Sequence, residues 1–290
     1  AMGTYIGKFG LKPGDFGGHE GLNEYLSISK PDVIKQVHLD YFEAGADVVG
    51  TNTFGCNRFV LAEYGLQDKV KELNLAAVKL AREAAAAASS PGLPRFVAGS
   101  VGPTNKALFV TGGATFDEFA GAYYEQMEAL MEGGADLLLV ETAHDISNIK
   151  AALAAAAELF SKRGRRLPVI VSVTMDRKNA MLSGQDTEAV CVTLEHFPLF
   201  ALGFNCSTGP KDLGLRLETL SKTSRFPLFA MPNAGLPDEN GKYNETPEEF
   251  AATMKKYAAD GLLSFAGGCC GTGPGHIKAL SAALKGLRPG

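Results

Sequence analysis

One pattern constrains the fold more than any other: a short apolar run, a turn of small residues and a longer amphipathic segment recur along the whole chain. The apolar runs, which predict strands, are 48–53, 95–100, 136–140, 168–174, 199–204, 227–231 and 262–266. The segments between them carry apolar residues at helical spacing. Strands that alternate with helices predict a parallel sheet covered by helices on its faces.

Residues 1–6 read as the end of a strand or the loop after it, which brings the expected number of strand-then-helix units to eight. Eight such units fit a closed α/β barrel, the (β/α)8 or TIM barrel, and we expect one domain over residues 1–290. A doubly wound open sheet is the alternative. No Gly-x-Gly-x-x-Gly sequence follows an early strand to favour it.

Bulk composition excludes several classes of protein. Hydrophobic residues make up 46% of the chain, charged residues 21%, and the net charge is −4, which is typical of a folded soluble protein. The one compact basic run, 162–166, lies where a helix should end, so we expect no nucleic-acid partner. No apolar run approaches the roughly 18 residues of a membrane span. An odd number of cysteines, five, without the spacing of secreted scaffolds favours the reducing cytoplasm.

The cysteines supply the strongest functional signal. Cys269 and Cys270 are adjacent and flanked by glycines, and Cys206 follows a separate predicted strand. A regular strand would point neighbouring side chains to opposite faces, whereas a glycine-rich turn allows both thiols to converge. Together with Cys206 they would form a three-sulfur site suited to zinc, with one tetrahedral position open.

The residues alone leave alternatives open. A buried thiol often acts only as a small hydrophobic group, which is the reading we prefer for Cys56 and Cys191. Cys269 and Cys270 could instead form a strained vicinal disulfide or bind a structural zinc. Structural zinc usually has four protein ligands on paired Cys-x-x-Cys sequences, which this chain lacks.

Polar residues gather where predicted strands end. They are Asn52, Ser100, Glu141, Asn205, Cys206, Asn233, Cys269 and Cys270. In a barrel the loops at the carboxyl ends of strands converge over one mouth, so these residues should face one cavity. Glu141 should bind a substrate cation there, unless it caps the next helix or pairs with an arginine. His38 lies in a helical stretch and is expected to have a core or surface role.

The motifs resemble those of the homocysteine S-methyltransferase family along essentially the whole chain. Its zinc signature resembles Gly203-Phe204-Asn205-Cys206 and Gly267-Gly268-Cys269-Cys270-Gly271, and its other landmarks resemble Ala1-Met2-Gly3-Thr4, Ala44-Gly45-Ala46-Asp47, Thr51-Asn52-Thr53-Phe54-Gly55, Gly99-Ser100-Val101-Gly102-Pro103 and Val140-Glu141-Thr142. Segments 205–210 and 232–237 are most similar to the homocysteine-binding module of cobalamin-dependent methionine synthases. The betaine-dependent branch usually has tyrosine at the position of Thr142.

The resemblance implies a zinc ion held by Cys206, Cys269 and Cys270, with the thiol of homocysteine as fourth ligand. It also implies that Asn233 binds the zinc when the substrate is absent. Three thiolates would leave the bound substrate sulfur negatively charged and able to accept a methyl group, giving methionine.

The resemblance also assigns the rest of the substrate. Glu141 would hold the ammonium group, and backbone amides around Ala1 and Met2, with help near Ser100, would hold the carboxylate; Asn52 is expected at the same mouth. The family normally has Asp-Gly just before the segment that begins at Ala1, and this aspartate is absent from the sequence.

The expected methyl donor is methylcobalamin carried on another module and regenerated from methyltetrahydrofolate. A chain of 290 residues has no room for the cobalamin-carrying and methyltetrahydrofolate-binding modules, so we expect one module of a larger enzyme with a truncated N-terminus. One alternative is a stand-alone methyltransferase that uses S-methylmethionine or betaine. A second alternative is a barrel with a structural zinc that acts as a binding module.

Overall fold

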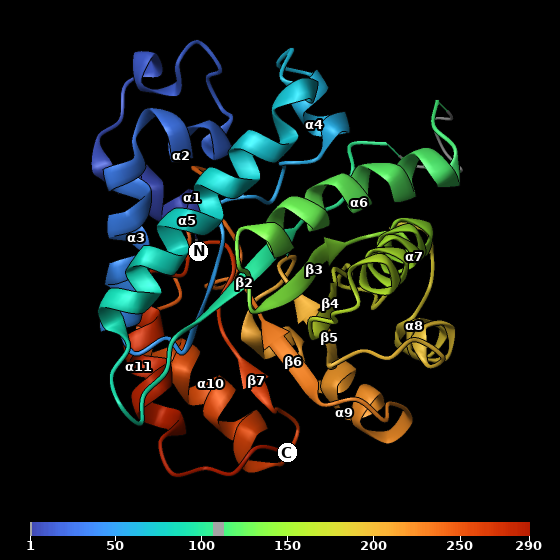
Figure 1. Cartoon of the computed structure of the whole chain (residues 1–290). Coiled ribbons are helices and arrows are strands. Elements are labelled where there is room, and N and C mark those ends of the chain that lie inside the picture. The colour runs from blue at the N-terminus through green and yellow to red at the C-terminus, as the bar shows by residue number, and fades with distance from the viewer. Residues whose placement is uncertain (1, 107–112) are drawn as a thin grey trace.

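A single parallel sheet organises the chain, with strands that pair in the order in which they occur in the sequence. The computed structural model describes residues 2–106 and 113–290 (Figure 1). The strands are β1 (Val48–Gly50), β2 (Phe96–Val101), β3 (Leu137–Ala143), β4 (Val169–Val173), β5 (Ala201–Asn205), β6 (Leu228–Met231) and β7 (Phe265–Ala266). Each predicted apolar run from 48–53 onward overlaps one of them, which confirms the α/β barrel-like class.

Helices surround the curled sheet and connect its strands (Figure 1). They are α1 (Met2–Ile6), α2 (Leu26–Ser29), α3 (Pro31–Glu43), α4 (Arg58–Ala62), α5 (Val70–Ala88), α6 (Phe116–Glu132), α7 (Ile146–Arg163), α8 (Thr187–Leu194), α9 (Gly214–Thr223), α10 (Pro247–Ala259) and α11 (Pro274–Leu284). Short 3₁₀ helices are η1 (Gly7–Phe9), η2 (Pro13–Phe16), η3 (Asn23–Tyr25), η4 (Gln67–Lys69) and η5 (Pro210–Asp212). In the described part of the chain, no helix is both long and apolar enough to cross a membrane.

Several helices begin at side chains that cap their free N–H groups. Asp145 precedes α7 and accepts a hydrogen bond from the backbone of Ser147 at 2.7 Å. Thr246 precedes α10 and exchanges hydrogen bonds with Glu249, three residues on. Such caps satisfy donors that have no partner within the helix. Asp145 therefore caps α7, and Glu141 does not.

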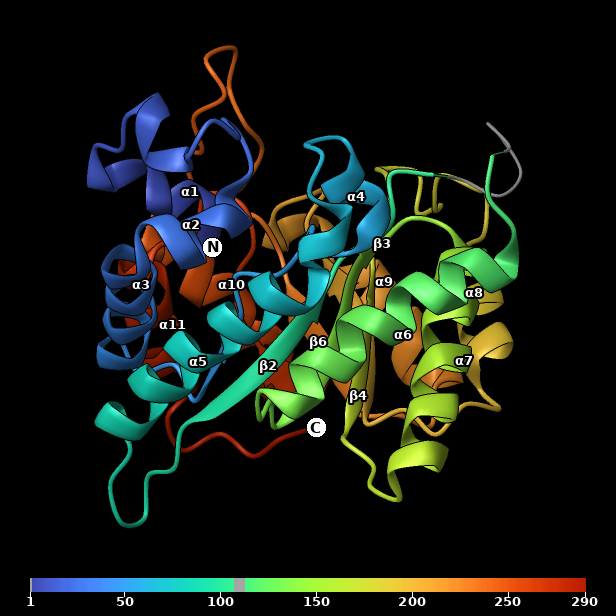
Figure 2. The same ribbon diagram turned by 45° about the horizontal axis from the view of Figure 1, so that its top comes forward.

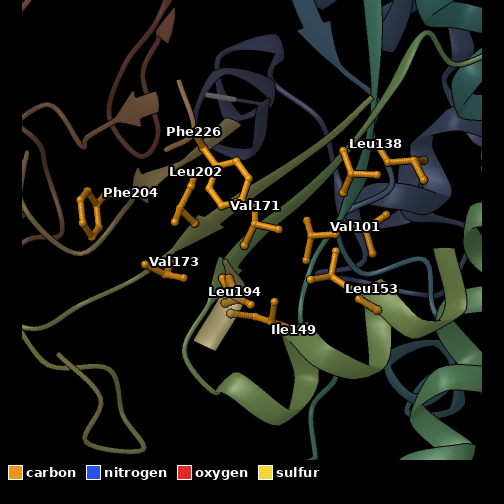
Figure 3. Packing of buried hydrophobic residues seen from close by; sticks show 14 of the residues in the cluster. Val101, Leu138, Ile149, Leu153, Val171, Val173, Leu194, Leu202, Phe204 and Phe226 are labelled. Atoms are coloured by element: carbon orange, nitrogen blue, oxygen red, sulfur yellow. The ribbon is translucent and has the colours of Figure 1, made fainter. Parts of the chain in front are cut away.

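Strands β4 and β5 are buried along their whole length, as central strands of parallel sheets in α/β proteins are, whereas β1 and β7 are partly exposed. One face of the sheet packs against the helices, and Figure 3 shows strand residues there against side chains of α7 and α8. The labelled strand residues on that face are Val101, Leu138, Val171, Val173, Leu202 and Phe204. The neighbouring positions form a separate cluster inside the curled sheet: Ala98, Leu139, Ile170, Ala201 and Phe229. This filled interior leaves the loops at the carboxyl ends of the strands to form a site.

The expectation for the first residues is wrong. Residues 2–6 form helix α1 rather than the end of a strand, and the described residues contain no eighth strand. Met2, Tyr5 and Ile6 recur at helical spacing and pack against the cluster that contains Leu26 and Ile34. Burial of this apolar stripe favours a helix for the segment.

His38 provides a test of the packing of α3. It is 1% exposed, its Nε2 has no hydrogen-bond partner among the described residues, and burial lowers its pKa to about 4. At a pH between about 4 and the ordinary pKa of 6.5, His38 is protonated in the unfolded chain and neutral in the folded protein. The free energy of unfolding should therefore fall by roughly 3 kcal/mol as the pH drops through this range.

Replacing His38 by leucine should remove this part of the acid sensitivity. Urea unfolding at a series of pH values from 7.5 to 4 measures it, and His196→Ala, at an exposed histidine, is the control. Equal slopes of stability against pH in wild type and His38→Leu would contradict the prediction.

Candidate metal centre and substrate site

Strand β6 brings the two cysteine loops together. It lies between β5, which leads to Cys206, and β7, which leads to Cys269 (Figure 1). The backbone N–H of Cys206 donates to Met231 at 3.1 Å, and that of Cys269 donates to Pro232 at 2.8 Å. Two loops far apart in the sequence are thus tied to consecutive carbonyls at the end of one strand.

The three sulfur atoms of Cys206, Cys269 and Cys270 lie within 4.8 Å of one another. The Sγ atoms of Cys206 and Cys270 are 3.7 Å apart. A disulfide would need about 2.05 Å. Two ligands of a tetrahedral zinc with bonds of about 2.3 Å lie about 3.8 Å apart, so the spacing suits a shared metal. None of the five cysteines forms a disulfide in the described part of the chain, and Cys56 and Cys191 are buried, as expected.

The cluster cannot hold three negative charges by itself. Hydrogen bonds from Cys206, Cys269 and Tyr243, in decreasing order of effect, lower the pKa of the Cys270 thiol to about 2. The hydrogen bonds of Cys269 to Cys206 and Cys270, together with burial, raise the pKa of the Cys269 thiol. One thiolate is therefore favoured at the expense of its neighbours. A divalent cation would remove this conflict, so the donor set fits zinc in charge as well as in geometry.

Backbone strain is concentrated around these sulfurs. Among the described residues, four that are not glycine have a positive φ: Thr142 at 56°, Asn179 at 62°, Cys206 at 62° and Ser207 at 64°. Three of the four flank the cluster, and one of them is β-branched, for which this conformation is rare. Strain of this kind persists where the surrounding structure enforces it, and it is typical of functional sites.

Glu141 lies where the register of β3 shifts against β4, between Val140 and Ala143. The Ser100 hydroxyl donates to Glu141 Oε1 at 2.6 Å, so the two predicted residues meet. Burial raises the pKa of Glu141, and the hydrogen bond from Ser100 partly opposes this. The ion pairs of the described residues do not include Glu141. The alternative in which Glu141 pairs with an arginine is therefore not observed among the described residues.

The Asn205 side chain connects this carboxylate to the cysteines. It is 1% exposed, and its Oδ1 accepts from Thr142 N–H and the Ser172 hydroxyl, both at 2.8 Å. Its Nδ2 donates to Thr142 Oγ1 at 2.7 Å and lies 3.5 Å from Glu141 Oε2 and 3.7 Å from Cys269 Sγ. The sequence shows Asn205 beside Cys206 in a motif, but no pattern in it indicates these contacts.

Tyr243 is a further neighbour that sequence reasoning missed. It belongs to the connection between β6 and α10, coloured orange, which projects at the top of Figure 2. Gly271 has a φ of 77°, and a Cβ there would lie 2.3 Å from the tyrosine ring. The Tyr243 hydroxyl is hydrogen-bonded to Cys270, and burial, with the nearby thiolate, raises the pKa of Tyr243 to about 12. It remains a neutral donor at physiological pH.

Two predicted asparagines have defined contacts. Asn233 Oδ1 accepts from the backbone N–H of Cys270 at 3.0 Å, which places this side chain beside the vicinal cysteines. Asn52 Nδ2 donates to Asn23 O at 2.8 Å and to Ser27 Oγ at 3.2 Å. The nitrogen of Asn52 therefore secures the segment before α3.

The N-terminal segment lies beside the same turn. Gly271 N–H donates to Thr4 Oγ1 of α1 at 3.2 Å. Met2 begins α1, and its side chain packs with the apolar cluster beneath it. Ala1 lies outside the described residues.

Sequence comparison agrees with this geometry. The sequence model of the family described as homocysteine S-methyltransferase matches residues 1–284. The chain belongs to this family. Methionine synthase of Mycobacterium tuberculosis is 38% identical over 291 residues, which cover 99% of this chain and 24% of that protein. The chain thus spans about a quarter of the length of this methionine synthase relative.

Solved structures of the homocysteine S-methyltransferase family share the fold. The metallated form of the Escherichia coli homocysteine methyltransferase MmuM has a TM-score of 0.79 and 28% identity, covering 97% of this chain and 93% of that chain. Its apo form gives a TM-score of 0.70 and 27% identity, covering 94% and 93%. The match to MmuM supports the predicted barrel class for the whole chain.

The close approach of β5 to β6 at Gly203 yields a test of how the site is built. A Cβ at Gly203 would lie 1.7 Å from the carbonyl oxygen of Phe229. Gly203→Ala should force β5 away from β6, cost about 1–3 kcal/mol or more of stability, and shift Cys206 relative to Cys270. Thermal unfolding and the stoichiometry of bound Zn²⁺ measure both effects. Gly50→Ala is the control, since nothing lies within 4 Å of its Cβ position; equal behaviour of the two variants would refute the prediction.

Proposed function

We propose that this chain binds a zinc ion through Cys206, Cys269 and Cys270 and activates the thiol of homocysteine for methylation to methionine. The observation that carries the proposal is the convergence of three sulfurs within 4.8 Å at the carboxyl ends of neighbouring strands. Membership of the homocysteine S-methyltransferase family supports the substrate. The similarity to the metallated form of MmuM, at 28% identity over 97% of this chain, supports a metal at this site.

When bound, zinc would supply the positive charge that allows a thiol with an ordinary pKa near 8.5 to lose its proton near neutral pH. The three cysteines hold that charge and leave one tetrahedral position for the substrate sulfur. Asn233, whose Oδ1 accepts from the Cys270 N–H at 3.0 Å, is our candidate for the ligand that the substrate replaces. Three anionic ligands favour a substrate sulfur that keeps its negative charge and acts as a nucleophile.

The substrate's amino-acid group is assigned to the neighbouring residues. Glu141 accepts the ammonium group, and Ser100 orients its carboxylate through the 2.6 Å hydrogen bond. In our proposal, backbone amides around Ala1 and Met2, with help near Ser100, bind the carboxylate of homocysteine. Asn52 acts indirectly, since it secures the segment that packs against the mouth.

We assign methylcobalamin on another module as the methyl donor, with methyltetrahydrofolate as the source of the methyl group. The similarity to a quarter of M. tuberculosis methionine synthase supports a role as one module of a larger methionine-forming enzyme. A stand-alone methyltransferase that uses S-methylmethionine or betaine is the second candidate, favoured by a match covering 93% of MmuM. A binding module with a structural zinc is the third.

Loss of Cys206 tests the metal site and the reaction together. Cys206→Ala should lose most of its zinc, and homocysteine-dependent demethylation of methylcobalamin should fall by more than the roughly 10- to 100-fold typical of losing an outer partner of a metal ligand. Metal analysis and the absorbance of methylcobalamin measure the two effects. Cys191→Ala, in the core, should retain both. Full zinc occupancy in Cys206→Ala would exclude the proposed site.

Proton release separates an enzyme from a structural zinc site. Mixing homocysteine with zinc-loaded protein should release about one proton for each site, because the thiol binds as a thiolate. A structural zinc with a closed coordination shell should release none. Parallel assays with methylcobalamin, S-methylmethionine and betaine then identify the donor.

The raised pKa of Glu141 predicts a pH dependence of binding. Its carboxylate becomes neutral at a less acidic pH than an ordinary carboxyl group, so homocysteine affinity should decrease as the pH falls toward that raised pKa. Glu141→Gln should weaken the binding of homocysteine about 10- to 100-fold, as expected for the loss of a charged hydrogen bond. It should also remove the dependence of this affinity on the protonation of residue 141. Calorimetric titrations with 4-mercaptobutanoate, which lacks the amino group, are the control. A variant that binds homocysteine like the wild type would argue against Glu141 as the ammonium site.

A further inference from the structure

We propose that Asn205 is a positioning residue that fixes the spacing between the Glu141 carboxylate and the Cys269 sulfur, and thereby selects homocysteine over shorter amino thiols. The inference rests on the proposed function, in which Glu141 binds the substrate ammonium and Cys269 holds the metal. It adds a specificity role for a side chain that contacts both partners without binding the metal itself.

The contacts of the Asn205 amide carry the first step. Its Nδ2 lies 3.5 Å from Glu141 Oε2 and 3.7 Å from Cys269 Sγ. One nitrogen therefore touches the expected ammonium acceptor and one expected metal ligand. The two contact lengths together set an upper limit on the distance between carboxylate and sulfur. A change in the position of this nitrogen would change that distance.

The second step is that the amide cannot turn. Its Oδ1 faces two donors, the Thr142 N–H and the Ser172 hydroxyl, each at 2.8 Å. Exchange of oxygen and nitrogen would place two donors against the amide NH₂ group, so the orientation is fixed. The Thr142 backbone, at a φ of 56°, is held in place by the same amide. Because Asn205 is only 1% exposed, no solvent space allows another rotamer.

The third step is the chemistry of the ligand. In homocysteine two methylene groups separate the sulfur from the carbon that bears the amino group, whereas cysteine has one. A site with rigid acceptors for sulfur and ammonium satisfies both groups for only one chain length. A site in which Glu141 moves relative to the metal would accommodate either. Rigid spacing is therefore a means of discrimination, and Asn205 supplies it.

Cobalt provides a readout that is independent of turnover. We would load wild type and Asn205→Ala with Co²⁺ and follow the sulfur-to-cobalt absorption while titrating homocysteine, cysteine and 4-mercaptobutanoate. Asn205→Ala should still bind one Co²⁺ per chain. The ratio of its affinities for homocysteine and cysteine should be at least tenfold lower than in the wild type. Its affinity for 4-mercaptobutanoate, which has no ammonium group, should stay within about threefold of wild type.

A milder variant keeps the test decisive if Asn205→Ala fails to fold. Ser172→Ala removes only the hydroxyl that donates to Oδ1, and it should reduce the preference in the same direction by a smaller factor. Thr174→Val is the matched control, because Thr174 donates to the backbone carbonyl of Asn205 and not to its amide. This control should retain the wild-type preference.

The outcomes distinguish the two proposals. Folded variants that keep the wild-type preference, or that bind all three thiols more weakly by the same factor, would overturn the positioning role and leave the proposed function intact. A wild-type protein that binds Co²⁺ but whose absorption does not respond to homocysteine would overturn the proposed function, and this inference with it.

Discussion

The arrangement depends on one electrostatic constraint: three thiols from two separate loops occupy a space too small for three uncompensated negative charges. Cys206 and Cys270 place their sulfurs 3.7 Å apart, and the cluster favours a thiolate at Cys270 while disfavouring one at Cys269. The chain maintains this geometry because both loops are hydrogen-bonded to the carbonyls of Met231 and Pro232, at the end of β6. The strand order of the sheet is thus the direct cause of the cluster.

Most of the fold could be predicted because its signals are local. Alternating apolar runs and amphipathic segments located the strands β1 to β7. The first segment could not be assigned this way. Met2 and Ile6 have a helical stripe only in relation to Leu26 and Ile34, which come later in the chain. With so few residues, tertiary contacts decide the conformation.

The same distinction between local signals and tertiary contacts applies to the residues of the site. The convergence of the cysteines could be predicted because the glycines beside them indicate a turn. The place of Glu141 could be predicted because it follows an apolar run typical of a strand. The contacts of Asn205 and Tyr243 could not, since they depend on geometry that no short window of sequence contains. Asn205, at the end of β5, reaches Glu141 of β3 across the intervening strand β4, and Tyr243 reaches Cys270 from the connection between β6 and α10.

Backbone strain and hydrogen bonding together explain why a neutral side chain, Asn205, lies between Glu141 and the cysteines. Thr142 and Cys206 have unfavourable backbone conformations, each costing on the order of 1–3 kcal/mol. The Asn205 amide receives the Thr142 N–H and donates to its hydroxyl, so the strained segment is held by the same group that contacts Cys269. A charged residue in that position would either repel thiolates or compete with the substrate ammonium for Glu141. A carboxamide does neither, because it supplies donors and acceptors without a net charge. In the proposed function, the neutral amide therefore lets the charges of the metal, the thiolates and the substrate balance one another, while the strand ends fix where those charges lie.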